Sequence, residues 1–200
     1  MADFSEVNYT NTLGLDNLQF PYLRLKTTFL ILAGFLDSGP EHWQTIWQQE
    51  ERGFDKLQHS DWENPDCTVW VSELAAKVSQ IKGPIILVAH SLACLLVPHW
   101  APLAPSSVIG ALLVSVPDPS GPNFPVEALG FAPVPMARLP FANLVVSSTT
   151  DPYGTQDYMQ RCARAWGARF HSVGDCGHIN ACSNLGDWPD GKALLRQLEA

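Results

Sequence analysis

Three side chains with the chemistry of an acyl-transfer site, Ser91, Asp151 and His178, each follow a stretch that is expected to be a buried strand. Residues 85–89 form an apolar run of strand length, and the residues after Ser91 suit a helix packed on a sheet. A serine at such a junction has its hydroxyl beside the free N–H groups of the helix, which is the geometry of a nucleophile elbow. The sequence therefore predicts an activated serine at residue 91.

The order of the three residues along the chain, serine then aspartate then histidine, is that of α/β-hydrolase triads. Ser91 would attack an acyl carbonyl, while His178 takes the serine proton and returns it to the leaving group. Asp151 would fix the imidazole tautomer and stabilise its positively charged form. The backbone N–H groups of Leu92 and Phe35 are expected to hold the oxyanion.

Each of these assignments has a structural alternative. Ser91 could simply cap the following helix, and Asp151, which precedes a proline, could be only a turn residue. Asp118 also ends an expected strand and is the second choice for the acid. A zinc site is a further alternative, with ligands drawn from His171, Cys176, His178 and Cys182. His90 is expected to be structural, and three other histidines are expected to have packing or surface roles: His42, His99 and His171.

The elements that must position these residues alternate along the chain. Apolar runs predict strands at residues 27–33, 54–58, 85–89, 109–116, 144–149 and 169–173. Helical spacing and terminal signals predict helices at residues 40–51, 64–81, 154–167 and 191–199, with a further helix beginning near Leu92. Most of the strands are apolar on both faces, which is typical of a parallel sheet covered on both sides. The predicted fold class is α/β, a three-layer α/β/α sandwich with a doubly wound, mostly parallel sheet of about six strands.

Composition and charge limit the possible partners. With 46% hydrophobic and 16% charged residues, the 200-residue chain can bury one good core. The net charge of -8 and the lack of a lysine or arginine cluster argue against binding to nucleic acid or to an anionic membrane. Five cysteines without a repeating framework, and no signal-peptide pattern, predict a cytoplasmic protein. Residues 1–26 are expected to form an N-terminal arm, and residues 27–200 a single domain.

The candidate substrate pocket should be narrow, because only the proline-rich loops at residues 117–140 are available to cover it. Five residues that lie on loops near strand ends are expected to line it: Phe35, Leu36, Phe124, Phe131 and Trp188. Four tryptophans in or beside helices are expected to pack in the core instead: Trp43, Trp47, Trp62 and Trp70.

Several motifs together resemble those of small serine hydrolases of the YdeN and retinoblastoma-binding-protein type. They include Gly34 with residues 38–44, residues 88–92 leading into 98–101, residues 147–153, residues 165–168, and residues 177–180 followed by Trp188 and Pro189. The resemblance runs from about residue 28 to the end of the chain. It implies a compact α/β-hydrolase fold without a large lid, and a triad of Ser91, Asp151 and His178. Ala93 departs from the family, which usually has glycine there, and the retinoblastoma-binding motif Leu-x-Cys-x-Glu is absent.

Two classes of function follow from the sequence. The first is a serine hydrolase that cleaves a small acyl ester or related activated carbonyl through an acyl-enzyme, without metal or organic cofactor. The second is a catalytically weak or inactive protein of the same fold that acts as a binding module. An acyltransferase would use the same acyl-enzyme with a non-water acceptor. The partner expected for the first class is a small acyl substrate, and the sequence predicts no particular protein partner.

Overall fold

The computed structural model describes residues 25–199, in which six strands form one sheet. The strands are β1 (Thr28–Leu32), β2 (Phe54–Lys56), β3 (Ile85–His90), β4 (Val108–Val114), β5 (Ala142–Ser147) and β6 (Arg169–Ser172). Their order is β2-β1-β3-β4-β5-β6, and every neighbouring pair is parallel. The predicted six-stranded sheet is therefore confirmed. The predicted arm at residues 1–26 lies outside the described residues except for its last two.

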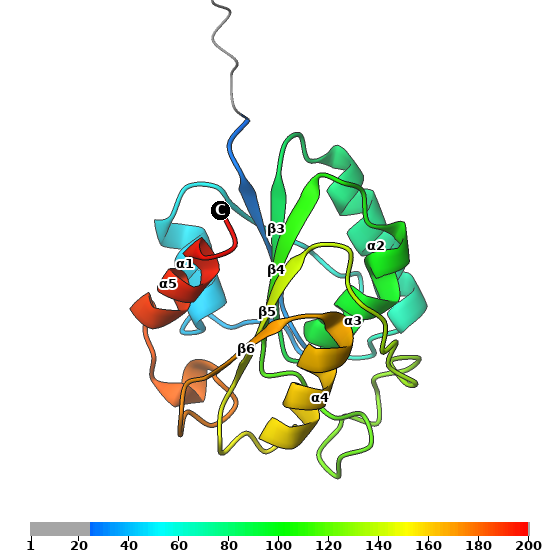
Figure 1. Cartoon of the computed structure of the whole chain (residues 1–200), viewed down its shortest axis with the longest axis vertical. Coiled ribbons are helices and arrows are strands. Elements are labelled where there is room, and N and C mark those ends of the chain that lie inside the picture. Colours follow the sequence, from blue (N-terminus) through cyan, green and yellow to red (C-terminus); the bar gives the residue numbers. More distant parts are fainter. Residues whose placement is uncertain (1–24, 200) are drawn as a thin grey trace, which may run out of the picture.

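Helices cover both faces of the sheet (Figure 1). α2 (Cys67–Gln80), α3 (Ala93–Trp100) and α4 (Gln156–Trp166) lie on one face, and α1 (Trp43–Glu50) and α5 (Pro189–Arg196) lie on the other. Short 3₁₀ helices follow at Ala101–Leu103 and Ala181–Ser183. The three-layer α/β/α architecture expected from the sequence is confirmed. Within residues 25–199, no helix is both long enough and apolar enough to cross a bilayer.

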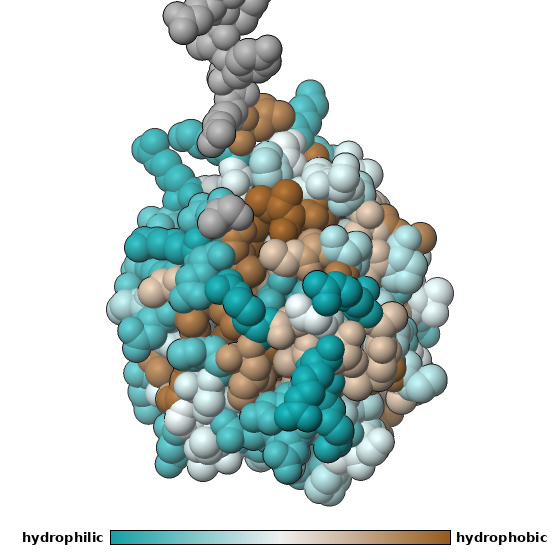
Figure 2. All heavy atoms as spheres, in the orientation of Figure 1, coloured by the Kyte–Doolittle hydropathy of each residue, from teal (hydrophilic) through white to brown (hydrophobic). Residues whose placement is uncertain are grey.

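Strand β3 shows why the sheet is buried on both sides. All six of its residues are buried, and successive side chains point to opposite faces. Leu87 and Ala89 pack in the cluster beneath α2, α3 and α4, whereas Ile86 and Val88 pack in the cluster beneath α1 and α5. On the face seen in Figure 2, hydrophobic residues gather between the two helical layers near the C-terminus, and hydrophilic residues cover the outer side of α1 and α5.

Capping side chains set the starts of the helices and explain the differences from the predicted boundaries. The helix predicted from residue 40 begins at Trp43, because the His42 side chain accepts a hydrogen bond from the Gln44 N–H. Asp66 and Thr155 likewise place α2 and α4 two or three residues later than predicted. The last helix instead begins early, at Pro189, whose fixed φ suits the first helical turn.

Residues 117–140 contain no helix or strand, as expected, and are held as an ordered loop by the helical layer beside them. Leu129 pairs with the segment that enters α2, where its carbonyl accepts from the Cys67 N–H at 2.9 Å. The Trp166 indole of α4 donates to the Pro135 carbonyl at 2.9 Å. His99 of α3 contacts the Phe131 carbonyl at 3.2 Å. This loop is therefore attached to α2, α3 and α4, and through Asp118 and Asn123 also to the segment that follows β5.

The order of the strands fixes where a site can form. From β1 the chain crosses to β2 on one side and then returns to β3 on the other side of β1. The connections that leave the carboxyl ends of β1 and β3 therefore diverge, and in open parallel sheets ligands bind in the crevice at such a point. The segments that follow these two strand ends are residues 33–39 and Ser91.

The cap of α2 gives a direct test of this part of the fold. The Asp66 carboxylate accepts from the N–H groups of Thr68 at 2.8 Å and Val69 at 3.1 Å. We predict that Asp66→Ala lowers the free energy of unfolding by about 1 kcal/mol, the usual value of a helix cap. Urea unfolding measures the change. Glu63→Ala, at an exposed neighbouring position, is the control, and equal losses in the two variants would contradict the capping role.

Candidate active site

A sharp turn joins β3 to α3 and carries Ser91. The serine has φ 54°, in the left-handed region that few non-glycine residues adopt. Its N–H donates to the Val114 carbonyl of the neighbouring strand at 3.0 Å, which holds the turn against the sheet. Ala89 and Ala93, on either side of the turn, are fully buried. The predicted elbow thus forms with alanine, and not glycine, at these two positions.

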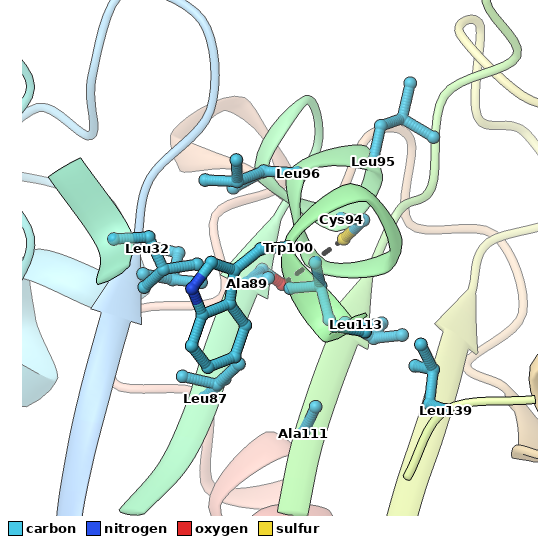
Figure 3. Close-up of a cluster of buried hydrophobic side chains, with 14 of the residues drawn as sticks. Leu32, Leu87, Ala89, Cys94, Leu95, Leu96, Trp100, Ala111, Leu113 and Leu139 are labelled. Carbon is cyan, nitrogen blue, oxygen red and sulfur yellow. Dashed lines mark hydrogen bonds between the residues drawn. The ribbon is translucent and has the colours of Figure 1, made fainter. Parts of the chain in front are cut away.

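The hydrophobic layer under α3 fixes the helix that follows the elbow (Figure 3). Trp100 lies over β3 near Leu87, and the Cys94 thiol points down to the strands. The Cys94 sulfur contacts the carbonyls of Ala89 at 3.5 Å and Val114 at 3.2 Å. Burial raises the pKa of this thiol well above its usual value, so Cys94 is an unreactive packing group beside the serine.

The structure brings Ser91, His178 and Asp151 together in a hydrogen-bonded chain. His178 Nε2 lies 2.8 Å from Ser91 Oγ, and its Nδ1 lies 2.9 Å and 3.0 Å from the two carboxylate oxygens of Asp151. The Asp151 side chain is fully buried and also accepts from the Tyr153 N–H at 3.0 Å. Asp118, the second choice for the acid, instead accepts from the Ser120 N–H in its own turn. Asp151 is therefore the carboxylate that contacts the histidine.

The loop that carries His178 is held from two sides. His90, the residue before the serine, contacts the carbonyl of His178 through Nε2 at 2.9 Å. Because a carbonyl only accepts, Nε2 of His90 must carry the proton. On the other side, the Gly177 N–H donates to Thr150 Oγ1 at 3.0 Å, and the Cys176 N–H donates to Ser148 Oγ at 3.0 Å. His90, predicted to be structural, therefore links the elbow directly to the histidine loop.

Two backbone amides belong to residues that line the cavity together with Ser91. The Leu92 N–H directly follows Ser91, and the Phe35 N–H belongs to the loop after β1. Within residues 25–199 neither amide donates a hydrogen bond, and both residues line the same cavity as Ser91. Gly34 permits this approach, because a Cβ there would lie 2.9 Å from the Ser91 Cβ and 3.0 Å from the His90 carbonyl. These two amides are the pair named from the sequence.

The loop after β1 holds a strained backbone. Leu36 and Asp37 have φ of 63° and 66°, and each such residue costs roughly 1–2 kcal/mol. Two contacts stabilise this strained conformation of the loop. The Leu36 N–H donates to the Trp62 carbonyl at 3.2 Å, and the Asp37 carboxylate lies 2.6 Å from the buried ammonium of Lys56.

A cavity of about 510 Å³ opens over Ser91 and His178. Its apolar lining includes Phe35 and Leu36, at the positions expected for pocket residues. The other three aromatic candidates do not line it, which corrects the sequence prediction. Phe131 is fully buried against Trp70, Phe124 packs against the core, and Trp188 packs between Trp43 and Trp47. An aromatic side chain on a loop can point into the core as readily as into a cavity. Here Phe131 and Trp188 point into the core because they pack against neighbouring tryptophans.

Two buried histidines beside the triad were expected to have only packing or structural roles, yet both line the cavity. Burial lowers the pKa of His42 to about 4, with a smaller contribution from His178. Burial also lowers the pKa of His90 well below its usual value. Both rings are therefore neutral at pH 7. His42 Nδ1 accepts from the Gln44 N–H, so the proton of this neutral ring sits on Nε2.

The zinc arrangement considered from the sequence is not formed. Among residues 25–199, no three histidine, cysteine or acidic side chains gather closely enough to hold a metal ion. His178 is engaged by Ser91 and Asp151, and His171 is exposed on β6.

The fold and the arrangement around Ser91 define the chain as an α/β-hydrolase-fold protein, and solved structures that are similar to it agree. A YdeN-like hydrolase from Pectobacterium atrosepticum is 26% identical, with a TM-score of 0.75 over 87% of this chain and 91% of that chain. The ydeN gene product of Bacillus subtilis is 18% identical, with a TM-score of 0.72 over 88% and 99%. A thermophilic esterase from Thermogutta terrifontis is 16% identical, with a TM-score of 0.61 over 87% and 90%.

The particular family follows from the sequence itself. The model of the family described as "Serine hydrolase" matches residues 29–197, so the chain belongs to this serine hydrolase family. A search of curated proteins finds no match. The resemblance to YdeN-type serine hydrolases is confirmed.

The buried neutral histidines predict loss of stability in acid. Since the folded state lowers the pKa of His42 from 6.5 to about 4, the unfolded chain binds more protons throughout this window. The free energy of unfolding therefore falls as the pH drops below 6.5, by up to about 1.4 kcal/mol per pH unit for such a histidine. His42→Asn keeps a capping side chain and removes this titration, so its stability should fall less between pH 7 and pH 5.

Urea unfolding at the two pH values measures this difference. His171→Asn, at an exposed position, is the matched control and should follow the wild type. A His42→Asn curve as steep as that of the wild type would contradict the buried, neutral state of His42.

Proposed function

We propose that this protein hydrolyses a small acyl ester or related activated carbonyl through an acyl-enzyme on Ser91. The observation that carries the proposal is the chain of contacts from Asp151 through His178 to Ser91, which ends in a cavity beside two unpaired amides. Membership of the serine hydrolase family supports it. One structural relative is described as an esterase, which favours ester substrates.

The proposed reaction uses each group in turn. Ser91 Oγ attacks the acyl carbon as its proton passes to His178 Nε2, and the carbonyl electron pair becomes an oxyanion between the Phe35 and Leu92 amides. When the oxyanion collapses, the bond to the leaving group breaks, and the leaving group takes the proton from His178. A water molecule then attacks the acyl-enzyme by the same route, giving the acid and free serine. Asp151 holds the imidazole in the tautomer with its proton on Nδ1.

The charge of the cavity lining narrows the substrate class. Among the described residues that line the cavity, none is lysine or arginine, and the two carboxylates are Asp37 and Glu127. Asp37 is paired with Lys56, whereas the exposed Glu127 has no ion-pair partner within residues 25–199. The neutral rings of His42 and His90 add no positive charge. An uncharged acyl substrate is therefore favoured over an anionic one.

Removing single members of the triad tests the proposed chemistry. Ser91→Ala should abolish labelling by a fluorophosphonate probe, because the nucleophilic oxygen is gone. Asp151→Asn should lower kcat by roughly 10⁴-fold, because the amide favours the wrong imidazole tautomer. Asp118→Asn is the matched control and should leave kcat unchanged. Labelling that persists in Ser91→Ala would contradict the assignment of the nucleophile, and absence of labelling in the folded wild type would favour a binding protein.

The charge preference is tested with a matched pair of substrates, the p-nitrophenyl esters of hydrogen glutarate and of methyl glutarate. The neutral methyl ester should have the higher kcat/KM, by roughly threefold to tenfold, as expected for one charge repelled near the protein surface. Glu127→Lys should remove or reverse this preference. Glu50→Lys makes the same change in net charge at the far end of α1 and should not. A wild-type preference for the anionic ester would contradict the proposed substrate class.

A further inference from the structure

A fully buried amide side chain, Gln44 of α1, lies over the end of β1 and the neighbouring part of β3. Its Nε2 donates to the Leu32 carbonyl at 3.1 Å and to the Val88 carbonyl at 2.9 Å. Its Oε1 accepts from the Ser38 hydroxyl at 2.7 Å. One side chain thus binds the last residue of β1, the middle of β3 and the loop between β1 and α1.

The position of these carbonyls shows where Gln44 binds the sheet. The pairing of β1 with β3 ends at Leu32 opposite Ala89. Both carbonyls belong to this last part of the ladder, and a carbonyl oxygen has a second lone pair that can accept a further hydrogen bond. Gln44 thus binds the two strands together at the end of their pairing.

The same helix holds the loop through a second contact. Thr45 Oγ1 donates to the Ser38 carbonyl at 2.9 Å, so α1 binds the Ser38 side chain through Gln44 and its backbone through Thr45. The strained residues Leu36 and Asp37 lie between this anchor and Phe35. Without the anchor, the loop could relax toward ordinary backbone angles and carry the Phe35 amide away from Ser91.

We propose that Gln44 is a positioning residue that sets the distance between the two amides of the oxyanion site, those of Phe35 and Leu92. It does so by tying the loop after β1 to the strand that leads into the elbow. Gln44 does not line the cavity, so it acts through the loop and not on the substrate. This inference rests on the proposed function, because the two amides act only if an oxyanion forms there.

The test replaces the contacts in graded steps. Gln44→Leu removes all three hydrogen bonds with little change in volume, and Ser38→Ala removes only the bond between Gln44 and the loop. Gln49→Leu makes the same substitution at an exposed position of the same helix and is the control. For each variant, kcat and KM for a p-nitrophenyl ester, the pH dependence of kcat, the rate of fluorophosphonate labelling and the thermal midpoint are measured.

Loss of the oxyanion geometry should lower kcat and the labelling rate together, because both reactions place negative charge between the two amides. For Gln44→Leu we expect a decrease of roughly 10- to 100-fold, up to the effect of losing one oxyanion donor. For Ser38→Ala we expect a smaller decrease. The midpoint of the pH profile should not change, since His178 and Asp151 are untouched, and KM should change less than kcat, because the cavity lining outside the loop after β1 keeps its place. Gln49→Leu should match the wild type.

A merely structural role would lower the thermal midpoint of Gln44→Leu while kcat, measured well below that midpoint, stays within twofold of the wild type; this result would overturn the inference. If Gln44→Leu does not fold, the inference is tested with Ser38→Ala alone. An unchanged kcat in that variant would also overturn the inference. Absence of Ser91-dependent turnover and labelling in the wild type would instead overturn the proposed function, and the inference with it.

Discussion

The close approach of two backbone segments, Gly34 after β1 and Ser91 after β3, is the constraint on which the rest of the site depends. A side chain at residue 34 would collide with the elbow, so only glycine allows the Phe35 amide to reach the same cavity as the Leu92 amide. This approach occurs where the two strands stop pairing and their chains diverge. The two segments must touch at Gly34 and Ser91 although their chains then run in different directions. Buried polar groups hold the segments together.

Those polar groups form a continuous framework around the cavity. Gln44 ties β1, β3 and the loop after β1 together, and His90 ties the elbow to the loop of His178. Asp151 fixes the ring of His178 from beneath, with its own carboxylate fully buried. Each of these groups has its hydrogen-bonding partners in place, which is how a polar side chain becomes tolerable in a hydrophobic interior. The side chains of Ser91, His178 and Asp151 are thereby held in place by contacts within the protein.

The sequence could predict the sheet and the places of Ser91, Asp151 and His178, because each follows an apolar run whose end is easy to recognise. It could not predict the residues that surround them. Gln44 and His42 look like ordinary polar residues at the start of a helix, and only the fold shows that Gln44 reaches carbonyls of both β1 and β3. Phe131 and Trp188 were misplaced for a related reason, since the direction of an aromatic side chain on a loop depends on which neighbours leave room for it.

The two walls of the cavity differ in what holds them. The wall with the serine, the histidine and the two amides lies at the strand ends, whereas the loop at residues 117–140 is bonded to α2, α3 and α4 and, through Asp118 and Asn123, to the segment that follows Asp151. Glu127 lines the cavity from this loop and is exposed, and within residues 25–199 its side chain makes no hydrogen bond or ion pair. The cavity can therefore change its charge at this position while the contacts among Ser91, His178 and Asp151 stay the same.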